Sequence, residues 1–437
     1  MLQGADVEFQ GISIDSRTVQ PGNVFFAIKG PRFDGHAFCH AALEKGAIAV
    51  IVENAITDIN APQLVVTDTT LALGQVAGLW RERFATPVVA VTGSSGKTTV
   101  KEMIAAILRQ AGPTLSTEGN LNNAYGVPLT LARLSQKDRF AVIEIGASAV
   151  GEIADIVPHV QPDVALITMI GPSHLEGFGS IDAIAHAKSE IYGGLRDLGT
   201  AVINRDDVYF DVMKAAAPEK TMTFGFDAAA DVHGRYSAGE LRIAVAQDTI
   251  SVSLPLPGKH NAYNALAAAA ACISVGCGLH QVRDGLRSMH AVKGRLMLRD
   301  DVDQYRLIDD SYNANPASVM AAIDVLSQES GVTCLVLGDM LELGDAADDM
   351  HAEIGVYASK ADIDHLLCIG DHVKHTCASF SGGKAHHADT FDELVAHCVA
   401  EVPLGGTVLV KGSRSSRMET FIDALAKKGN AAGGEQP

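Results

Sequence analysis

Residues that could hold a phosphate chain gather where an apolar run, Val88–Thr92, meets the turn Gly93-Ser-Ser-Gly-Lys-Thr-Thr99. Glycines let backbone N–H groups turn toward an anion, and a following helix presents the positive end of its dipole. We expect Lys97 to reach the terminal phosphates and the Thr98 hydroxyl to complete a Mg²⁺ shell. The full motif has glycine where Val91 stands, so a chance match in a surface turn is the alternative. The strand before the turn and the helical pattern after it favour ATP or GTP binding.

Glu144 lies near the carboxyl end of a second apolar run, 140–145, and His174 follows a third, 163–168. A carboxylate inside an apolar run is costly unless it is paired or bound to a metal. Ligands of open α/β sheets bind outside the carboxyl ends of the strands, where an acidic residue commonly serves the nucleotide's Mg²⁺. His174 lies in the glycine-rich segment 171–180, which we place at the same sheet edge. The alternatives are a salt-bridged glutamate and an ordinary surface histidine.

Lys188 interrupts an apolar stripe. The pattern from Ile181 to Leu195 is helical, and its apolar positions and Lys188 fall within about 80° at ~100° per residue. A buried ammonium must find a carboxylate, lose its proton or be covalently modified. In the alternative, the stem packs on the core and the charged head reaches water.

Other polar side chains cluster near helix starts and strand ends. Asn261 and Asn264 are three residues apart, so both amides lie on one helix face, where they cap the helix or read a base edge. The segment 204–207, Asn-Arg-Asp-Asp, loosely resembles the guanine-reading motif of GTPases, with arginine in place of lysine. The polar segments 309–316 and 411–416 each follow a predicted strand, and the second suits a carboxylate.

The elements that position these residues predict an α/β protein of three domains. Residues 1–85 show short strands at 25–28, 47–52 and 63–66 and a helix at 71–84. In residues 86–292, continuous apolar runs at 88–92, 140–145, 163–168 and 200–203 predict a parallel sheet covered on both faces. In residues 293–437, runs at 306–308, 333–337, 365–369 and 407–411 predict a second α/β domain, and we expect the tail from Lys427 to fray.

Composition indicates a globular chain of the cytoplasm. With 437 residues, 47% hydrophobic, 20% charged and a net charge of −18, the chain is a poor partner for nucleic acid or anionic membranes. The seven cysteines form no C-x-x-C pair or zinc-ligand spacing, which favours a reducing cytosol. No signal peptide opens the chain, and its most apolar stretch, 265–279, is too short to span a bilayer and is typical of a buried helix.

The order and spacing of many short stretches resemble the Mur ligases, the ATP-dependent amide-forming enzymes of peptidoglycan synthesis. The similar stretches cover essentially the whole chain: 92–98, 119–123 with 126–128, 142–146, 174–179, 187–190, 256–264, 294–295, 309–315, 338–344 and 411–414. This family uses a shortened phosphate loop, so the presence of Val91 in place of a glycine does not argue against nucleotide binding. The resemblance implies a small mixed α/β N-terminal domain for the UDP-sugar, a central P-loop parallel-sheet ATPase domain and a C-terminal Rossmann-like domain for the incoming dipeptide.

The resemblance also implies roles for single residues. Catalytic roles fall to Lys97, Glu144, His174, Lys188 and Arg295. Thr98 and Glu144 would hold one Mg²⁺ and His174 a second, and a carbamylated Lys188 would be an anionic metal ligand. ATP would contact Thr92, Gly93, Ser94, Ser95, Gly96, Lys97, Thr98, Thr99, Asn261, Asn264, Arg295 and Asp310. The UDP-sugar substrate would contact Ser16, Arg17, Asn120, Asn122 and Asn123. Relatives usually begin with an extra helix, whereas this chain starts at Met1-Leu-Gln-Gly.

The implied reaction joins D-alanyl-D-alanine to UDP-N-acetylmuramoyl-tripeptide through an acyl phosphate and a tetrahedral intermediate, in a monomer. The segments 309–315 and 338–344 favour a dipeptide-adding member over a sibling that adds one amino acid. A nucleotide switch without covalent chemistry would prefer GTP, and a kinase would leave a stable phosphorylated product.

Overall fold

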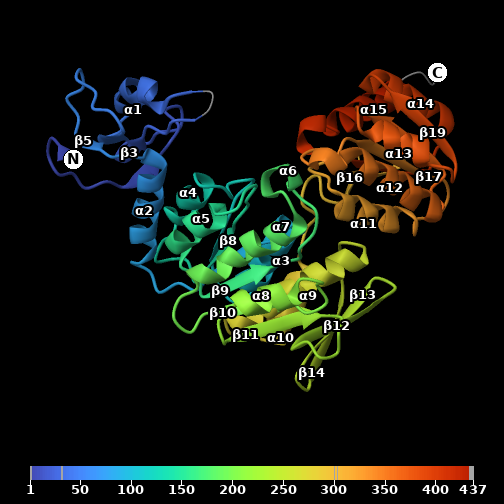
Figure 1. The fold of residues 1–437 in the computed structure, drawn as a ribbon, viewed down its shortest axis with the longest axis horizontal. Coiled ribbons are helices and arrows are strands. Elements are labelled where there is room, and N and C mark those ends of the chain that lie inside the picture. Colours follow the sequence, from blue (N-terminus) through green and yellow to red (C-terminus); the bar gives the residue numbers. More distant parts are fainter. Residues whose placement is uncertain (1, 31–32, 300, 303, 433–437) are drawn as a thin grey trace.

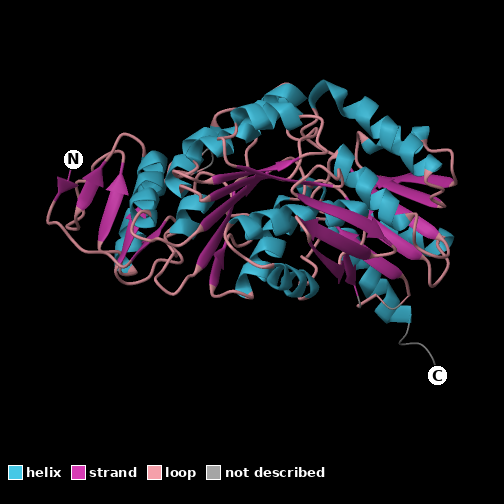
Figure 2. Ribbon diagram, turned by 90° about the horizontal axis from the view of Figure 1, so that it is seen from below, coloured by secondary structure: helices cyan, strands magenta, loops and turns pink. Residues whose placement is uncertain are grey.

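The computed structural model describes residues 2–30, 33–299, 301–302 and 304–432 (Figure 1). Three sheets follow one another along the chain, and in Figure 1 the central one lies between the N-terminal and C-terminal ones. Figure 2 shows helices on either side of the strands. The predicted α/β class is confirmed.

The N-terminal sheet has the order β1-β5-β4-β3-β2, with β1 antiparallel at one edge and the other four strands parallel. Its strands are β1 (Leu2–Gln3), β2 (Gly11–Ser13), β3 (Asn23–Phe26), β4 (Ala49–Val52) and β5 (Gln63–Val65), with the helices η1 (Gly35–Phe38) and α1 (Cys39–Glu44). The predicted strand 25–28 is thus displaced, because the amide of Ile28 turns back to the carbonyl of Phe26 (2.9 Å).

Helix α2 (Thr69–Arg81) connects the first sheet to the second. It starts two residues earlier than predicted because the Asp68 side chain accepts hydrogen bonds from the amides of Thr70 and Leu71, a helix N-cap. Its first half packs in the core of the N-terminal sheet through Ala72 and Leu73, and its second half packs on α4 (Gly126–Leu131) and α5 (Glu152–Val160).

The central sheet has nine strands in the order β14-β13-β12-β11-β10-β9-β6-β8-β7. They are β6 (Val88–Thr92), β7 (Thr114–Ser116), β8 (Phe140–Glu144), β9 (Val164–Ile167), β10 (Thr200–Asn204), β11 (Thr221–Gly225), β12 (Val232–Ser237), β13 (Glu240–Val245) and β14 (Asp248–Ser253). Alternate residues of β6 enter two separate cores: Val89 and Val91 one, Val88 and Ala90 the other. Burial of both faces explains the continuous apolar runs.

Helices cover both faces of this sheet. One face carries α3 (Lys97–Arg109), α9 (Lys259–Ser274) and α10 (Leu279–Arg287). The other carries α4, α5, α6 (Leu175–Phe178), α7 (Ile181–Ser189), η2 (Glu190–Gly194) and α8 (Phe210–Ala216). The predicted helix 181–195 therefore ends early and tightens into the 3₁₀ turn η2, and the stretch 265–279 is a buried α9 followed by a turn.

The sequence interpretation missed the meander β12-β13-β14 at one edge of the central sheet. These strands pair antiparallel, and β14 exposes most of its polar residues. They lack the continuous apolar run that marks a strand buried on both faces.

The C-terminal sheet has the order β15-β16-β20-β17-β18-β19, parallel except for β15. Its strands are β15 (Met297–Arg299), β16 (Arg306–Asp310), β17 (Thr333–Gly338), β18 (His365–Ile369), β19 (Lys384–Ala388) and β20 (Thr407–Lys411). Its helices are α11 (Pro316–Leu326), η3 (Gly344–Ala346), α12 (Ala347–Lys360), α13 (Val373–Ser379), α14 (Phe391–Glu401), η4 (Arg414–Ser416) and α15 (Glu419–Ala432).

Helix α15 continues past Lys427 to Ala432, so the prediction of a frayed tail is wrong up to that residue, and residues 433–437 lie outside the described residues. All seven cysteines are free. No helix within the described ranges is both long and apolar enough to cross a bilayer.

Candidate active site

The phosphate loop joins β6 to α3 through two glycines with positive φ. Gly93 has φ 145° and Gly96, at the start of α3, has φ 81°. A Cβ at Gly93 would lie 1.9 Å from Thr168 Oγ1, and one at Gly96 would lie 2.5 Å from Asn264 Oδ1. Glycine is therefore required at both positions for backbone conformation and for space. Thr168 also donates a hydrogen bond to the carbonyl of Ser95 (2.6 Å), which fixes the loop.

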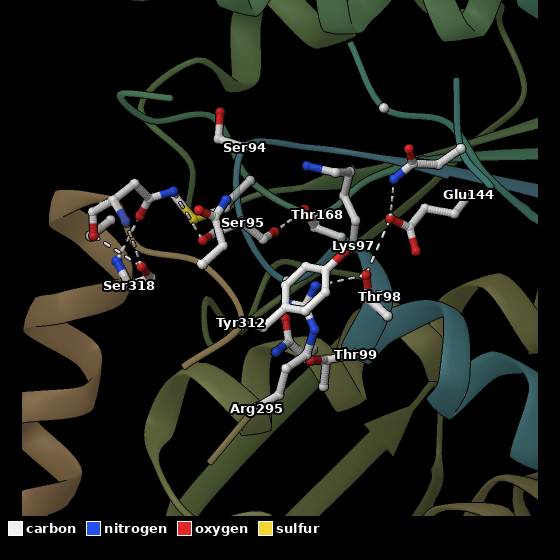
Figure 3. A pocket seen from close by; sticks show the side chains of 18 of the residues that line it. Ser94, Ser95, Lys97, Thr98, Thr99, Glu144, Thr168, Arg295, Tyr312 and Ser318 are labelled. Atoms are coloured by element: carbon white, nitrogen blue, oxygen red, sulfur yellow. Dashed lines mark hydrogen bonds between the residues drawn. The ribbon is translucent and has the colours of Figure 1, made fainter. Parts of the chain in front are cut away.

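A chain of hydrogen bonds crosses the base of this loop (Figure 3). Arg295 Nη2 donates to Thr98 Oγ1 (2.9 Å), which donates to Glu144 Oε1 (3.2 Å). Asn122 Nδ2 donates to the same carboxylate oxygen (2.8 Å). Lys97 Nζ donates to the carbonyl of Gly93 (2.8 Å), and burial lowers the pKa of Lys97. Positive groups and one buried carboxylate thus converge where a triphosphate would lie.

Lys188 is fully buried on α7, and its Nζ has no hydrogen-bond partner among the described residues. The nitrogen lies 5.2 Å from the centre of the Phe178 ring. Burial, and then the like charge of Lys97, lower the pKa of Lys188 to about 7. The alternative in which the head group reaches water is wrong, because the whole side chain is enclosed.

His174 lies in a positive-φ conformation (51°) immediately before α6. Its Nδ1 forms a hydrogen bond with Glu342 Oε2, a residue of the C-terminal unit. Burial is the main reason that the pKa of His174 lies below its usual value, which favours the neutral ring at pH 7.

The paired asparagines of α9 contact each other: Asn264 Nδ2 donates to Asn261 Oδ1 (3.1 Å). Asn261 Nδ2 donates to the carbonyl of Pro257 (2.8 Å). Asp310, at the end of β16, receives a hydrogen bond from Lys411 Nζ (2.6 Å) and from the amide of Leu296 (3.1 Å).

The segment that resembled a guanine reader is used for loop structure instead. Asn204 Nδ2 donates to the carbonyl of Thr168 (3.3 Å), and its oxygen accepts from the amide of Asp206 (3.1 Å). Asp207 accepts hydrogen bonds from the amides of Ile170 (2.8 Å) and Tyr209 (2.9 Å). These contacts favour a structural role for the segment.

One cavity of about 1010 Å³ brings most of the predicted residues together. Its walls include Ser94, Ser95, Gly96, Lys97, Thr98, Thr99, Asn120, Asn122, Asn123, Glu144, His174, Asn261, Asn264, Arg295 and Asp310. Thr92, Gly93 and Lys188 are not among the residues that line it. Ser16 and Arg17 lie in the N-terminal unit away from it, with Arg17 largely exposed and ion-paired to Asp15 (2.7 Å).

Comparison with known proteins accounts for all three sheets. Residues 8–81 match the model of the Mur ligase family, catalytic domain, residues 91–272 match the Mur ligase middle domain, and residues 294–414 match the Mur ligase, glutamate ligase domain. The chain is 43% identical, over 98% of its length and 96% of the relative's, to UDP-N-acetylmuramoyl-tripeptide–D-alanyl-D-alanine ligase of Escherichia coli. The chain belongs to the Mur ligase family.

Other family members match along most of their length. The ligase of the same name from Bacillus subtilis is 34% identical over 96% of this chain and 92% of its own. The crystal structure of MurF from Acinetobacter baumannii superposes with a TM-score of 0.91, at 38% identity over 97% of this chain and 95% of that chain. MurF of Thermotoga maritima in complex with ADP has a TM-score of 0.85, at 27% identity over 97% and 98% of the two chains.

Within this Mur ligase fold, three residues of the site carried no role in the sequence interpretation. Thr168 supports the phosphate loop through its hydrogen bond to Ser95. The ring of Tyr312 lies beside Arg295, with the guanidinium 4.5 Å from the ring centre (Figure 3). Asn315 Nδ2 donates to Ser95 Oγ (3.4 Å). Tyr312 and Asn315 belong to the polar segment 309–316, so their segment was identified although their contacts were not. Thr168 gave no signal, because a threonine at a strand end is ordinary.

The predicted magnesium ligands fit a cation in part. Glu144 Oε2 is buried and has no hydrogen-bond partner in the described part of the chain. A buried carboxylate oxygen without a partner suits a bound cation. The described residues contain no group of three or more His, Cys, Asp or Glu side chains that could hold a metal ion. The carboxylate of Glu144 is therefore one ligand of a set that the nucleotide, water and the Thr98 hydroxyl would complete.

Proposed function

We propose that this Mur ligase couples ATP hydrolysis to the joining of D-alanyl-D-alanine to UDP-N-acetylmuramoyl-tripeptide. One observation carries the proposal: ligases named for this reaction match nearly the whole chain. The site agrees with it, because the phosphate loop, Glu144 and Arg295 line one cavity. We further propose the limits 1–85, 86–292 and 293–437 for the three domains.

In this proposal the tripeptide carboxylate attacks the γ-phosphorus of ATP, and ADP leaves, so that an acyl phosphate forms. The amine of the dipeptide then adds to the acyl carbon, loses a proton, and inorganic phosphate leaves from the tetrahedral intermediate. Lys97 and Arg295 stabilise the negative charge on the transferred phosphoryl group. Asn261 and Asn264 would contact the base, and Asp310 and the loop backbone from Gly93 to Thr99 would position the rest of the nucleotide.

Two Mg²⁺ ions would be held by Thr98 with Glu144 and by His174 with a carbamylated Lys188, and would supply positive charge to the phosphoryl oxygens. The pKa of Lys188 near 7 supports the modification, because only the neutral amine attacks CO₂ and then releases a proton. The carbamate would turn the buried Lys188 Nζ, which has no hydrogen-bond partner among the described residues, into part of an anionic group that can bind a metal ion.

The residues that would bind the UDP-linked peptide are proposed from where they lie in the chain and around the cavity. Asn120, Asn122 and Asn123 line the cavity and would hold the sugar-peptide near the γ-phosphate. Ser16 and Arg17 of the N-terminal domain would bind the uridine end, away from the chemistry. We propose that the enzyme acts as a monomer in the cytoplasm.

The test uses purified full-length protein, ATP, Mg²⁺ and UDP-N-acetylmuramoyl-tripeptide, with release of phosphate and the mass of the product as readouts. Phosphate release that requires D-alanyl-D-alanine, and a product heavier by the dipeptide less water, support the proposal. Amide formation with a single amino acid instead would identify a sibling ligase. GTP preference without amine dependence would indicate a nucleotide switch, and a stable phosphorylated peptide would indicate a kinase.

A further inference from the structure

Two loops from different units of the molecule meet through His174 and Glu342. The imidazole Nδ1 and the carboxylate Oε2 form a hydrogen bond across 168 positions of sequence. The backbone adds a second contact, since the amide of Glu176 donates to the carbonyl of Glu342 (3.3 Å). A two-point contact fixes the orientation of one loop relative to the other, which a single surface ion pair does not.

Both partners adopt a backbone conformation that side-chain-bearing residues rarely adopt. His174 has φ 51° and Glu342 has φ 63°. Such residues persist where the surrounding structure holds them, and they concentrate at functional sites. A matched pair of them in direct contact across a domain junction therefore calls for a functional explanation.

Glu342 is held firmly by its own domain. On one side, the amide of Met340 donates to His351 Nε2 (3.0 Å) and the amide of Leu341 donates to Ser413 Oγ (2.8 Å). On the other side Leu343 is buried in the core. The position of the carboxylate consequently follows the position of the C-terminal unit, although 57% of the Glu342 side chain is exposed.

The contact also determines which nitrogen of His174 is free. A carboxylate only accepts hydrogen bonds, so Nδ1 carries the hydrogen, and the neutral ring then has its lone pair on Nε2. Nε2 makes no hydrogen bond to any residue that the structure describes, and His174 lines the cavity. Histidines that bind a metal through one nitrogen are typically oriented by a carboxylate at the other.

We propose that Glu342 is a positioning residue that couples docking of the C-terminal domain to the orientation and tautomer of His174. With the domain docked, the histidine offers Nε2 to the phosphate site. Without the contact, the ring and its left-handed backbone are free to turn away. This inference rests on the proposed function, in which His174 serves the second Mg²⁺.

The kinetic test compares Glu342→Ala with Asp345→Ala, an exposed acidic residue three positions away. We expect kcat of Glu342→Ala to fall about 10–100-fold, as for other residues that orient a metal ligand. The KM for ATP should stay within about twofold, because the phosphate loop is untouched, and Asp345→Ala should behave as wild type. Glu342→Gln keeps an acceptor for Nδ1–H and should recover a large part of the loss.

A second arm places Glu342→Ala on a His174→Ala background. If Glu342 acts through the histidine, the added loss disappears there, as expected for coupled residues. Equal losses on both backgrounds, or a Glu342→Ala enzyme indistinguishable from Asp345→Ala, would overturn the proposal.

A spectroscopic arm needs no turnover. In ¹⁵N-histidine-labelled full-length protein, the ring signals absent from His174→Ala identify His174, and they should report the Nδ1–H tautomer. Glu342→Ala should shift these signals toward the Nε2–H form, whereas Asp345→Ala should not, and an unchanged tautomer in Glu342→Ala would refute the inference. Should the wild-type chain form no amide, the proposed function fails while the ring signals still decide the role of Glu342.

Discussion

The two junctions of the central sheet with its neighbours are built in opposite ways. At the N-terminal junction, Arg81 at the end of α2 is fully buried and donates to the carbonyls of Val160 (3.2 Å), Phe84 (2.8 Å) and Gln161 (3.2 Å). Close packing accompanies it, since His159 fills the space beside Gly74 and Gly78. This junction is closely packed around a buried charge.

At the C-terminal junction, by contrast, several polar contacts line or flank the cavity. Arg295 reaches Thr98, Asn315 reaches Ser95, and Glu342 reaches His174. Such contacts exchange readily with water or a ligand, whereas a buried guanidinium has no substitute for its carbonyl partners. The first junction therefore holds the N-terminal and central units in one fixed arrangement. The second is suited to closing around substrates and excluding water from an acyl phosphate.

The strongest test of the polar junction is Arg295→Ala. Loss of a charged donor from the phosphoryl site should lower kcat by about 10³-fold, in the range found for removal of one such donor. The thermal unfolding midpoint should change little, because the arginine bridges two units and not a core. Coupled-assay kinetics and calorimetry measure both quantities, with exposed Arg235→Ala on β12 as the control. A large drop in stability with retained activity would contradict the division between the junctions.

The packed junction should show the reverse behaviour in Arg81→Ala. Three backbone carbonyls and Asp163 lose a buried partner, so we expect a loss of about 3 kcal/mol in unfolding free energy. The kcat of the protein that remains folded should be close to wild type. Chemical denaturation followed by activity per folded molecule provides the measurement, and the nearby exposed Arg83→Ala is the control. Unchanged stability would show that the junction does not depend on Arg81.

Lys188 belongs to neither junction, and its substitution tests whether the reaction needs this residue. Lys188→Ala should lower kcat by about 10²-fold, or about 2.7 kcal/mol, while affinity for ADP stays within a few-fold. Activity of the wild type should also fall in buffer stripped of bicarbonate and return when bicarbonate is added. Lys137→Ala, on the surface, should match wild type in both assays. A Lys188→Ala enzyme with normal turnover would remove this residue from the site.

The smallest expected effect concerns packing alone. In Gly74→Ala, the new methyl would lie 2.7 Å from the His159 ring, so the junction must shift at a cost of about 1–2 kcal/mol. Gly193→Ala places a methyl in open space and is the matched control. Thermal denaturation of both variants measures the difference. A neutral Gly74→Ala would mean that the junction is looser than its contacts indicate.

Most of the central unit could be predicted from the sequence because its strands are buried on both faces. The runs at 88–92 and 407–411 coincide with β6 and β20 residue for residue. The half-exposed meander β12-β13-β14 gave no such run and was missed. Among the site residues, Lys188 stood out because a charge inside an apolar stripe conflicts with its surroundings. In the structure its buried nitrogen has no hydrogen-bond partner among the described residues.

The phosphate loop, the parallel strands and the family can be predicted from the amino-acid sequence, since each depends on residues adjacent in the chain or on their order. The burial of Arg81 and the contacts of Arg295 with Thr98 and of Glu342 with His174 are visible only in the folded chain. These contacts join residues 79, 197 and 168 positions apart, and local periodicity carries no information on such distances. Which residues meet in this way depends on how whole domains pack. That packing is driven by the total apolar surface removed from water and not by any one segment.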